Sequence, residues 1–177
     1  GYFGPITRAK VNASAGGSTG GSTGGSTGGT TGGGLQGGAG SVDTFTAISG
    51  LSGEHVGEDE EDVEIAGVEV EVDDGSDIEI TAVRLDFSTQ PGNNDLDEFV
   101  TEVSIWLDGE ELARIDSDEF TDDDAFDKTI SLDDGGIIKA GERGDLTIAI
   151  SGASNIDSAD AGDTWTLEFE SVRFIDA

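Results

Sequence analysis

Residues 99–115, FVTEVSIWLDGEELARI, decide the fold class of this chain. The apolar residues of the first half recur with the period of two that places side chains on one face of a β-strand: Phe99, Val103, Ile105 and Leu107. Asp108-Gly109 then favours a two-residue hairpin, because both residues tolerate the positive φ that such a turn requires. Residues 112–115 return as the partner strand, and Trp106 falls on the opposite face. The stretch therefore predicts an antiparallel β-hairpin.

The same pattern continues on both sides of the hairpin, between residues 42 and 177. Two runs skip one residue, near Ala66-Gly67 and near Ala82, which is typical of a β-bulge. Residues 133–136, Asp-Asp-Gly-Gly, predict a turn. Further strands are predicted at 42–48, 63–72, 78–87, 129–132, 137–138, 146–150 and 165–174. With no convincing helix, eight or nine strands predict an all-β fold, an antiparallel β-sandwich of the immunoglobulin-like or jelly-roll type.

Three segments resemble the β-sandwich domains that are common in cell-surface proteins of bacteria and archaea. They are IWLDGEELARI (105–115), IIKAGERGDLTIAISG (137–152) and AGDTWTLEFESVRF (161–174). They are also similar in style to pilus and thread subunits that assemble by strand donation. The resemblance covers roughly residues 60–177 and names no particular family. It implies an extracellular structural role and transfers no catalytic residue.

The N-terminal 42 residues differ from the rest of the chain in composition and in charge. Residues 16–40 are built on a repeated Gly-Gly-Ser-Thr, and glycine makes up 16 of the first 42 residues but 13 of the other 135. Arg8 and Lys10 are the charged residues of this part, whereas the remainder holds all 39 acidic residues and six basic ones. We therefore divide the chain into an arm (1–15), a Gly/Ser/Thr-rich linker (16–41) and an acidic β-domain (42–177).

The arm has the pattern of a short strand. From residue 6 to residue 13, small apolar residues alternate with a set that contains Arg8 and Lys10. Pro5 has no N–H to give to a ladder, so the strand is expected to begin at or after it. We interpret the arm as a strand donated to an acidic neighbouring copy; a frayed terminus with chance alternation is the alternative. The predicted assembly residues are Tyr2, Phe3, Ile6, Arg8, Lys10 and Val11.

Two observations would decide against this interpretation of the arm: its insertion in the sheet of its own molecule, or the absence of any contact. Sugars are a separate prediction for this part of the chain. Asn12-Ala13-Ser14 matches the acceptor pattern for N-glycosylation, which makes Asn12 a candidate glycan site. The Ser/Thr pairs of the linker are suited to O-linked sugar in an extracellular product, although an engineered linker is a competing explanation.

The formal net charge of −31 bears on partners and on location. Self-repulsion of this size requires screening by salt or cations, which a saline or divalent-rich exterior provides. Nucleic acids and anionic membranes are disfavoured as partners because they require clustered Lys and Arg, and no apolar run is long enough for a membrane helix. The chain opens at Gly1, which we interpret as a processed product, or else a protease-trimmed recombinant one. We expect an extracellular or cell-surface location.

Calcium is the one cofactor that the sequence suggests, because it takes six to eight oxygen donors. No cluster is an EF-hand: Glu98 stands where that loop needs Gly, and Ser104 stands where it needs a bidentate Glu. Solvated acidic loops are the alternative, since 39 acidic residues also cluster by chance. The candidate ligands form three clusters: Asn93, Asp95, Asp97 and Glu98; Asp116, Asp118, Glu119, Asp122, Asp123 and Asp124; and Asp157, Asp160 and Asp163.

An enzyme is not expected. No pair of carboxylates stands out from the acidic background, His55 is the only histidine, and cysteine is absent, so neither a common zinc site nor a nucleophile motif is present. The sequence predicts a structural subunit of an extracellular filament, pilus-like fibre or surface lattice, with copies of itself as partners. The alternative is a monomeric calcium-dependent adhesin or carbohydrate-binding β-sandwich module on a Gly-rich stalk.

Overall fold

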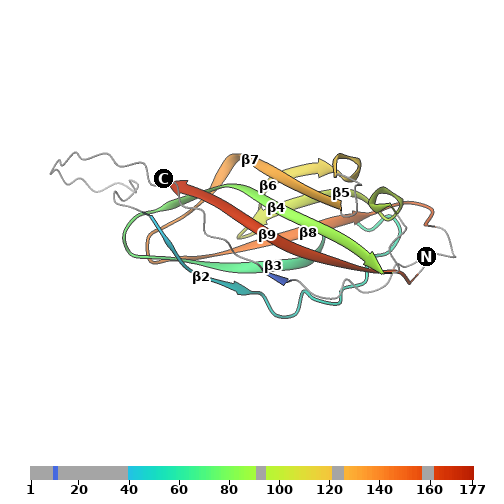
Figure 1. The fold of residues 1–177 in the computed structure, drawn as a ribbon, viewed down its shortest axis with the longest axis horizontal. Helices are drawn as coiled ribbons and strands as arrows, with labels where there is room; N and C mark the ends of the chain where they lie inside the picture. Colours follow the sequence, from blue (N-terminus) through green and yellow to red (C-terminus); the bar gives the residue numbers. More distant parts are fainter. Residues whose placement is uncertain (1–9, 12–39, 91–94, 121–125, 157–161) are drawn as a thin grey trace.

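The computed structural model describes residues 10–11, 40–90, 95–120, 126–156 and 162–177. These residues form two β-sheets packed face to face (Figure 1). The four-stranded sheet has the order β1 (Lys10–Val11), β9 (Thr164–Asp176), β4 (Ile78–Gln90), β7 (Phe126–Ile138). The five-stranded sheet has the order β2 (Val42–Ala47), β3 (Val63–Val72), β8 (Arg143–Gly152), β5 (Val100–Leu107), β6 (Glu110–Asp116). The predicted all-β sandwich is confirmed.

Neighbouring strands run antiparallel, with the exception of β1, which is parallel to β9. Two short 3-10 turns, η1 (Leu96–Glu98) and η2 (Ser117–Glu119), lie before β5 and after β6. In the described parts of the chain, no helix is long and apolar enough to span a membrane.

The alternating apolar residues of both sheets meet in one core. β3 contributes Val68, Val70 and Val72, and β9 contributes apolar residues at alternate positions on its inner face. Trp165 is 1 % exposed and packs edge-on against Phe99. Burying one large apolar side chain of this kind stabilises the fold by roughly 1.5–3 kcal/mol, so the inner faces hold the sheets together.

The local signals of the sequence are found where they were predicted. Asp108 and Gly109 have φ values of 51° and 83°, and they connect β5 to β6 as the expected two-residue turn. The register of β3 against β8 shifts between Glu64 and Ala66, and that of β4 shifts between Ile80 and Ala82. Both predicted bulges are therefore confirmed.

The turn predicted at residues 133–136 is wrong. β7 runs through these residues to Ile138, and its pairing with β4 jumps from Ser131↔Ala82 to Gly136↔Ile80. The extra residues therefore form a bulge and do not reverse the chain. Glycine serves close approach here, because a Cβ on Gly135 would collide with the carbonyl oxygen of Ile80.

Candidate assembly edge

The arm meets the body of the protein at the free edge of β9. Lys10 and Val11 form the short parallel strand β1 (blue arrow in Figure 1), in register with Glu168 and Phe169. β1 also lies next to β2, so it sits on the side of the sandwich where the edges of the two sheets come together. β9 has 13 residues, and within the described chain the other eleven have no strand beyond β9. Part of this edge is therefore paired with β1, and the described chain adds no strand along the remainder.

The C-terminal end of the linker, at Gly40, lies near the C-terminal end of β9. The backbone N–H of Gly40 donates a hydrogen bond of 2.6 Å to Oδ1 of Asp176, whereas Val11 pairs with Phe169, seven residues earlier. Seven strand residues span about 23 Å. The 28 residues from 12 to 39 can reach about 95 Å at most. The chain between arm and body is thus several times longer than this pairing requires.

Two residues of the arm, Lys10 and Val11, are consequently found in the sheet of their own molecule, which is one of the two observations that we stated would decide against the sequence-based interpretation. Of the predicted assembly residues, Lys10 and Val11 are placed; Tyr2, Phe3, Ile6 and Arg8 lie outside the described residues, as does Asn12, the candidate glycan site. Docking on a neighbouring copy would require that the same pairing be made between two molecules.

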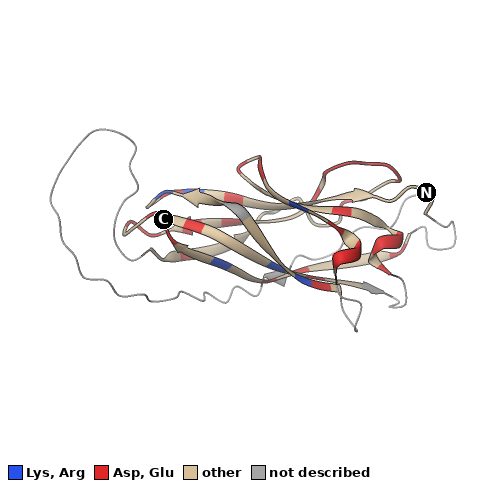
Figure 2. Cartoon of the chain, turned by 90° about the horizontal axis from the view of Figure 1, so that it is seen from above, with Lys and Arg blue, Asp and Glu red and all other residues tan. Residues whose placement is uncertain are grey.

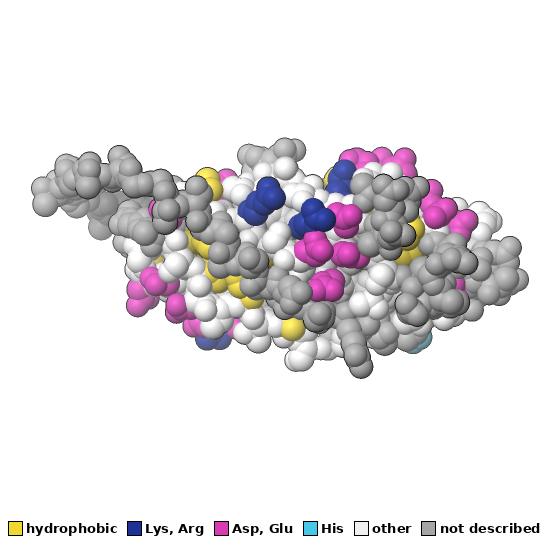
Figure 3. Space-filling model, viewed as in Figure 1, with side chains coloured by type: hydrophobic (Ala, Val, Ile, Leu, Met, Phe, Trp, Pro, Cys, Tyr) yellow, Lys and Arg dark blue, Asp and Glu magenta, His cyan; other side chains and the backbone are white. Residues whose placement is uncertain are grey.

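A row of carboxylates crosses the outer face of the four-stranded sheet and ends at the arm. Asp127 of β7 is in register with Asp86 of β4, and Asp86 is in register with Glu168 of β9. The next residue in this register is Lys10 of β1. We call Asp127, Asp86 and Glu168 the acidic row. Figure 3 shows acidic side chains gathered in the middle of this face, beside basic ones.

Arg84 partly neutralises this face. Its guanidinium forms ion pairs with Glu170 and, at 2.6 Å, with Asp127, and the hydrogen bond to Glu170 raises the pKa of Arg84. Burial raises the pKa of Asp86 above its ordinary value, and repulsion from Glu170, Asp127 and Glu168 adds to this effect. Arg84 acts in the opposite direction, but the pKa of Asp86 stays raised.

The opposite edge of the same sheet, β7, is built differently. Lys128 is in register with Leu85, which is fully buried, so Lys128 belongs to the inward-facing row of an edge strand. Its Nζ reaches Oε2 of Glu119 in η2 at 2.8 Å. β7 also lies next to β6 of the other sheet. An inward charge and a bulge are two devices that keep an edge strand from pairing with another molecule.

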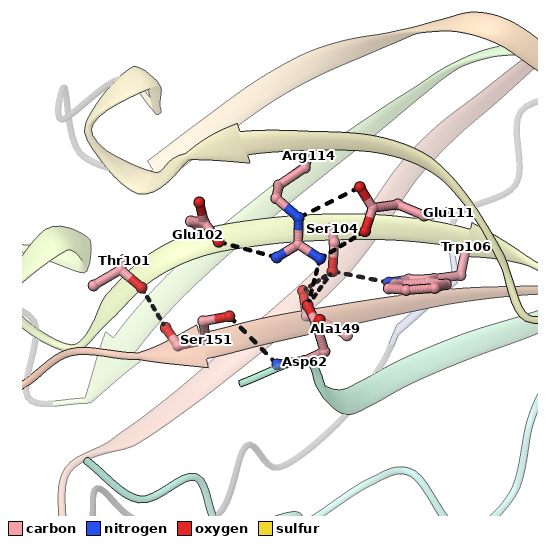
Figure 4. A network of polar contacts seen from close by, with 9 residues as sticks. All are labelled: Asp62, Thr101, Glu102, Ser104, Trp106, Glu111, Arg114, Ala149 and Ser151. Atoms are coloured by element: carbon pink, nitrogen blue, oxygen red, sulfur yellow. Dashed lines mark hydrogen bonds and ion pairs between the residues drawn. The ribbon is translucent and has the colours of Figure 1, made fainter. Parts of the chain in front are cut away.

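The outer face of the five-stranded sheet carries a polar network centred on Arg114 (Figure 4). The guanidinium contacts Asp62 at 2.8 Å, Glu102 at 2.9 Å and Glu111 at 2.6 Å. Hydrogen bonding to Glu111 is the largest of the effects that raise the pKa of Arg114. A polar cavity of about 420 Å³ adjoins the network, lined by Asp59, Glu60, Glu61, Asp62, Thr101, Glu102, Arg114, Ser151, Gly152 and Ser154.

Trp106 lies on this outer face, opposite Val103, Ile105 and Leu107, as the alternation predicted. Its indole N–H donates a hydrogen bond of 2.9 Å to the hydroxyl of Ser104, which is itself 1 % exposed. This hydrogen bond fixes the orientation of the indole, which lies beside Arg114 on the outer face and is partly exposed.

The calcium candidates are only partly described. Asp95 just before η1, Asp97 in η1 and Asp118 in η2 line one cavity of about 240 Å³, so two clusters that are distant in sequence come together. Figure 2 draws both 3-10 turns in red at the same end of the sandwich. In the portion of the chain that the structure places, no three acidic or histidine side chains form a metal-binding group. Asn93, Asp122, Asp123, Asp124, Asp157 and Asp160 lie outside it.

The remaining candidates are spread over the surface. Asp116 ends β6 and is exposed, Glu98 and Glu119 are exposed, and Asp163 lies just before β9. Glu119 bonds Lys128. Calcium binding therefore stays a prediction.

Sequence reasoning missed the acidic row. Its members come from three strands that are far apart in the chain, and each appears in the sequence as an ordinary exposed position of an alternating strand. The alternation of Glu168 and Glu170 with buried residues was a usable signal of an acidic outer face on β9. The registers that align Glu168 with Asp86 and Asp127 are set by long-range pairing, which no local pattern reveals.

We compared the chain with protein-family models, curated proteins and solved structures. None of them matches it.

Proposed function

We propose that this chain is a structural subunit of an extracellular filament, pilus-like fibre or surface lattice, in which the arm of one copy docks beside β9 of the next. The observation that supports this proposal is the pairing of β1 with β9, because it identifies the edge that accepts the arm. An added strand at a sheet edge is a common mode of protein recognition.

A shift from pairing within one chain to pairing between chains needs no new interface. The same backbone groups of Glu168 and Phe169 pair with the same segment in both cases, as in domain swapping. The connection from residue 12 to residue 39 is long enough for the arm to leave its own body. Pairing within the chain is favoured in dilute solution by the high effective concentration of a tethered segment, so assembly requires a high local concentration of subunits.

A crosslinking experiment distinguishes the two arrangements. The chain has no cysteine, so Lys10→Cys in one preparation and Glu168→Cys in another introduce one thiol each. Neighbouring strands bring paired Cα atoms within the range that a disulfide spans. On mixing at high concentration and oxidising, we expect disulfide-linked dimers between the two variants, whose yield rises with concentration. Electron microscopy of the unmodified protein under the same conditions should show filaments or a lattice.

Two controls accompany the mixture. Lys10→Cys mixed with Arg173→Cys, an exposed position four residues beyond Phe169, measures chance collision. The double variant Lys10→Cys, Glu168→Cys measures pairing within one chain. If the first mixture yields no more mixed dimer than the Arg173→Cys control at any concentration, the arm does not dock on a neighbour and the assembly proposal fails.

A second candidate is the calcium-dependent adhesin or carbohydrate-binding module. The cavity that brings Asp95, Asp97 and Asp118 together favours it, as does the fixed indole of Trp106 on the outer sheet face. This function requires a monomer whose melting temperature rises with Ca²⁺ and falls with a chelator, or a glycan that Trp106→Ala no longer binds. Equal melting temperatures with calcium and with chelator would remove the calcium version.

A further inference from the structure

We infer that the docking site of the arm is the first part of β9, from Thr164 to Glu170, and that the docked arm covers it with residues 6–12, parallel to β9 and in the register of β1. The inference rests on the proposed role of the β9 edge as the docking site, and it names the two segments that pair there. The structure describes two of these arm residues, Lys10 and Val11. An arm of the same molecule and an arm of a neighbour would meet the same edge.

β9 consists of two parts that differ in their pairing. From Thr164 to Phe169 its residues pair with β4 one for one. The next paired residue is Ser171, so Glu170 is an extra residue that interrupts the ladder. Up to Glu170 the side chains alternate between half-buried and buried positions, and β1 is paired within this part. The first part of β9 is therefore a regular edge that ends at the bulge.

The arm matches this edge in its alternation. Parallel strands advance together residue by residue, so the observed pairs of β1 fix the partner of every residue of a longer strand. The small residues of the arm then fall opposite the buried inner row of β9, and the set that contains the two cations falls opposite the half-buried outer row. The inner pairs are Thr7 with Trp165, Ala9 with Leu167 and Val11 with Phe169, and the outer pairs are Ile6 with Thr164, Arg8 with Thr166, Lys10 with Glu168 and Asn12 with Glu170.

The ends of the two segments coincide as well. Pro5 falls opposite Asp163, the residue before β9, and proline has no N–H to give to a ladder. Asn12 falls opposite Glu170, where the bulge interrupts the edge. The expected start of the arm strand therefore meets the start of β9, and the alternating part of the arm is as long as the regular part of the edge.

A shift by two residues keeps the alternation but loses this match. With Arg8 beside Glu168, Pro5 falls beside Trp165, inside β9, and the first two residues of β9 have no arm strand beside them. The opposite shift places the first two residues of the arm strand ahead of β9. Of the three registers, the observed one starts both strands at the same place.

Disulfides within one chain test the register. The protein has no cysteine, so each full-length double variant carries one pair of thiols. Paired residues on neighbouring strands have Cα atoms about 5 Å apart, whereas residues two positions out of register are about 8 Å apart, which is beyond the span of a disulfide. In a glutathione buffer at low protein concentration, we expect Arg8→Cys, Thr166→Cys to form its disulfide about tenfold more favourably than two shifted controls. The controls are Arg8→Cys, Glu168→Cys and Arg8→Cys, Thr164→Cys, and mass spectrometry after blocking of free thiols measures the oxidised fraction.

Hydrogen–deuterium exchange of the full-length protein tests the length of the strand. Successive N–H groups of a strand point to opposite sides, so two consecutive prolines remove one that faces β9. Thr7→Pro, Arg8→Pro should speed exchange of the backbone amides of residues 164–167 roughly tenfold, because an uncovered edge opens more readily. The matched control is Tyr2→Pro, Phe3→Pro, which lies ahead of Pro5 and should leave this exchange unchanged.

Two results would overturn the inference. One is equal oxidation of the three thiol pairs, and the other is an effect of the prolines at positions 7 and 8 no larger than that of the prolines at positions 2 and 3. The assembly proposal is judged separately by crosslinking between molecules. Selective pairing of Arg8→Cys with Thr166→Cys in one chain, without dimers between Lys10→Cys and Glu168→Cys, would keep the paired segments and reject assembly. Such dimers together with equal oxidation of the three pairs would do the reverse.

Discussion

The two edges of the four-stranded sheet are protected by different means. β7 carries an inward-facing lysine, a bulge at residues 133–136 and a neighbouring strand from the other sheet. β9 presents 13 residues whose edge, within the described chain, is covered by the two residues of β1 alone. The first protection is built into the strand itself, and the second is a separate segment on a long tether.

The difference indicates which edge is available for use. An edge strand that bends, bulges or carries inward charge cannot easily be extended by another chain. An edge strand with a regular alternation can be extended, and it needs a removable cover to keep it from unwanted pairing. β7 is therefore protected by features of its own. β9 also shifts register against β4, between Phe169 and Ser171, but it alternates regularly from Thr164 to Glu170, and this part is covered by the separate segment β1.

The largest expected effect of a single substitution concerns the edge strand β7. In Gly135→Ala the new Cβ would collide with the carbonyl oxygen of Ile80, so the bulge of β7 has to move. We expect a loss of about 2–3 kcal/mol in the free energy of unfolding, as for overpacking at other rigid sites. Urea unfolding measures it, with Ser131→Ala, an exposed position of β7, as the control. A loss as small as that of the control would mean that the bulge is not a rigid device.

The next effect concerns β6, which lies beside β7. Arg114→Ala leaves Asp62, Glu102 and Glu111 without their shared cation on the outer face. We expect the free energy of unfolding to fall by about 1–2 kcal/mol, since the group is partly exposed and each pair is screened. Thermal melting at low and high salt measures this, and Arg114→Lys should recover part of the loss. An unchanged melting temperature in Arg114→Ala would show that the ion pairs of Arg114 do not stabilise β6 and its neighbours.

A smaller effect on stability, with a change in association, is expected for the charge of β7. Lys128→Val places an apolar side chain beside Leu85 and removes the pair with Glu119. The free energy of unfolding should change by less than about 1 kcal/mol, while light scattering should show association that the parent lacks. The Lys128→Val variant and the parent protein with Lys128 both carry Val11→Pro. This substitution removes an N–H from the arm strand, so the arm does not contribute to the association that is measured. If the Lys128→Val variant stays monomeric, the inward charge is not what protects β7.

The smallest effect concerns the middle of the acidic row. The pKa of Asp86 is raised in the folded state, so the folded protein binds this proton more readily than the unfolded chain does. The contribution of Asp86 to stability therefore increases as the pH falls from neutral through its raised pKa, and it is fully present below the unfolded pKa. Asp86→Asn should stabilise the protein by roughly 0.2–1 kcal/mol at neutral pH and low salt.

The gain from Asp86→Asn should shrink as the pH is lowered from neutral to about pH 4, near the ordinary pKa of an aspartate, because the raised pKa of Asp86 favours its protonated form in the fold. Melting temperatures of both proteins at the two pH values measure this. A gain of the same size at both pH values would contradict the assigned repulsion.

The features that sequence predicted correctly are those determined by neighbouring residues. The turn at Asp108-Gly109 follows from the positive φ that these residues tolerate, and the bulges near Ala66 and Ala82 follow from a skipped alternation. The turn predicted at residues 133–136 was wrong because the sequence Asp-Asp-Gly-Gly suits a bulge as well as a turn. In the fold, the side chains of Leu107 and Leu112 lie so close to Gly136 that a Cβ at this position would collide with them.

Only part of the candidate site could be predicted from the sequence. The strand pattern of the arm predicted a paired segment that includes Lys10 and Val11, and these two residues form β1; the rest of the predicted strand lies outside the described residues. The docking edge was not identified, because the order β9-β4-β7 joins strands that are separated by long stretches of chain. Docking within one molecule was likewise not expected, because the contrast of charge between arm and body is the same for one copy as for two.

The parallel orientation of β1 has a mechanical consequence. The chain leaves Val11 in the direction in which β9 continues towards Asp176. Tension transmitted through the linker from that side would pull along the strand axis, so the hydrogen bonds of the ladder would be loaded in shear, all at once, and would not be unzipped one by one. The pairing of β1 with β9 would therefore resist a pull along the strand axis more strongly than a pull across it.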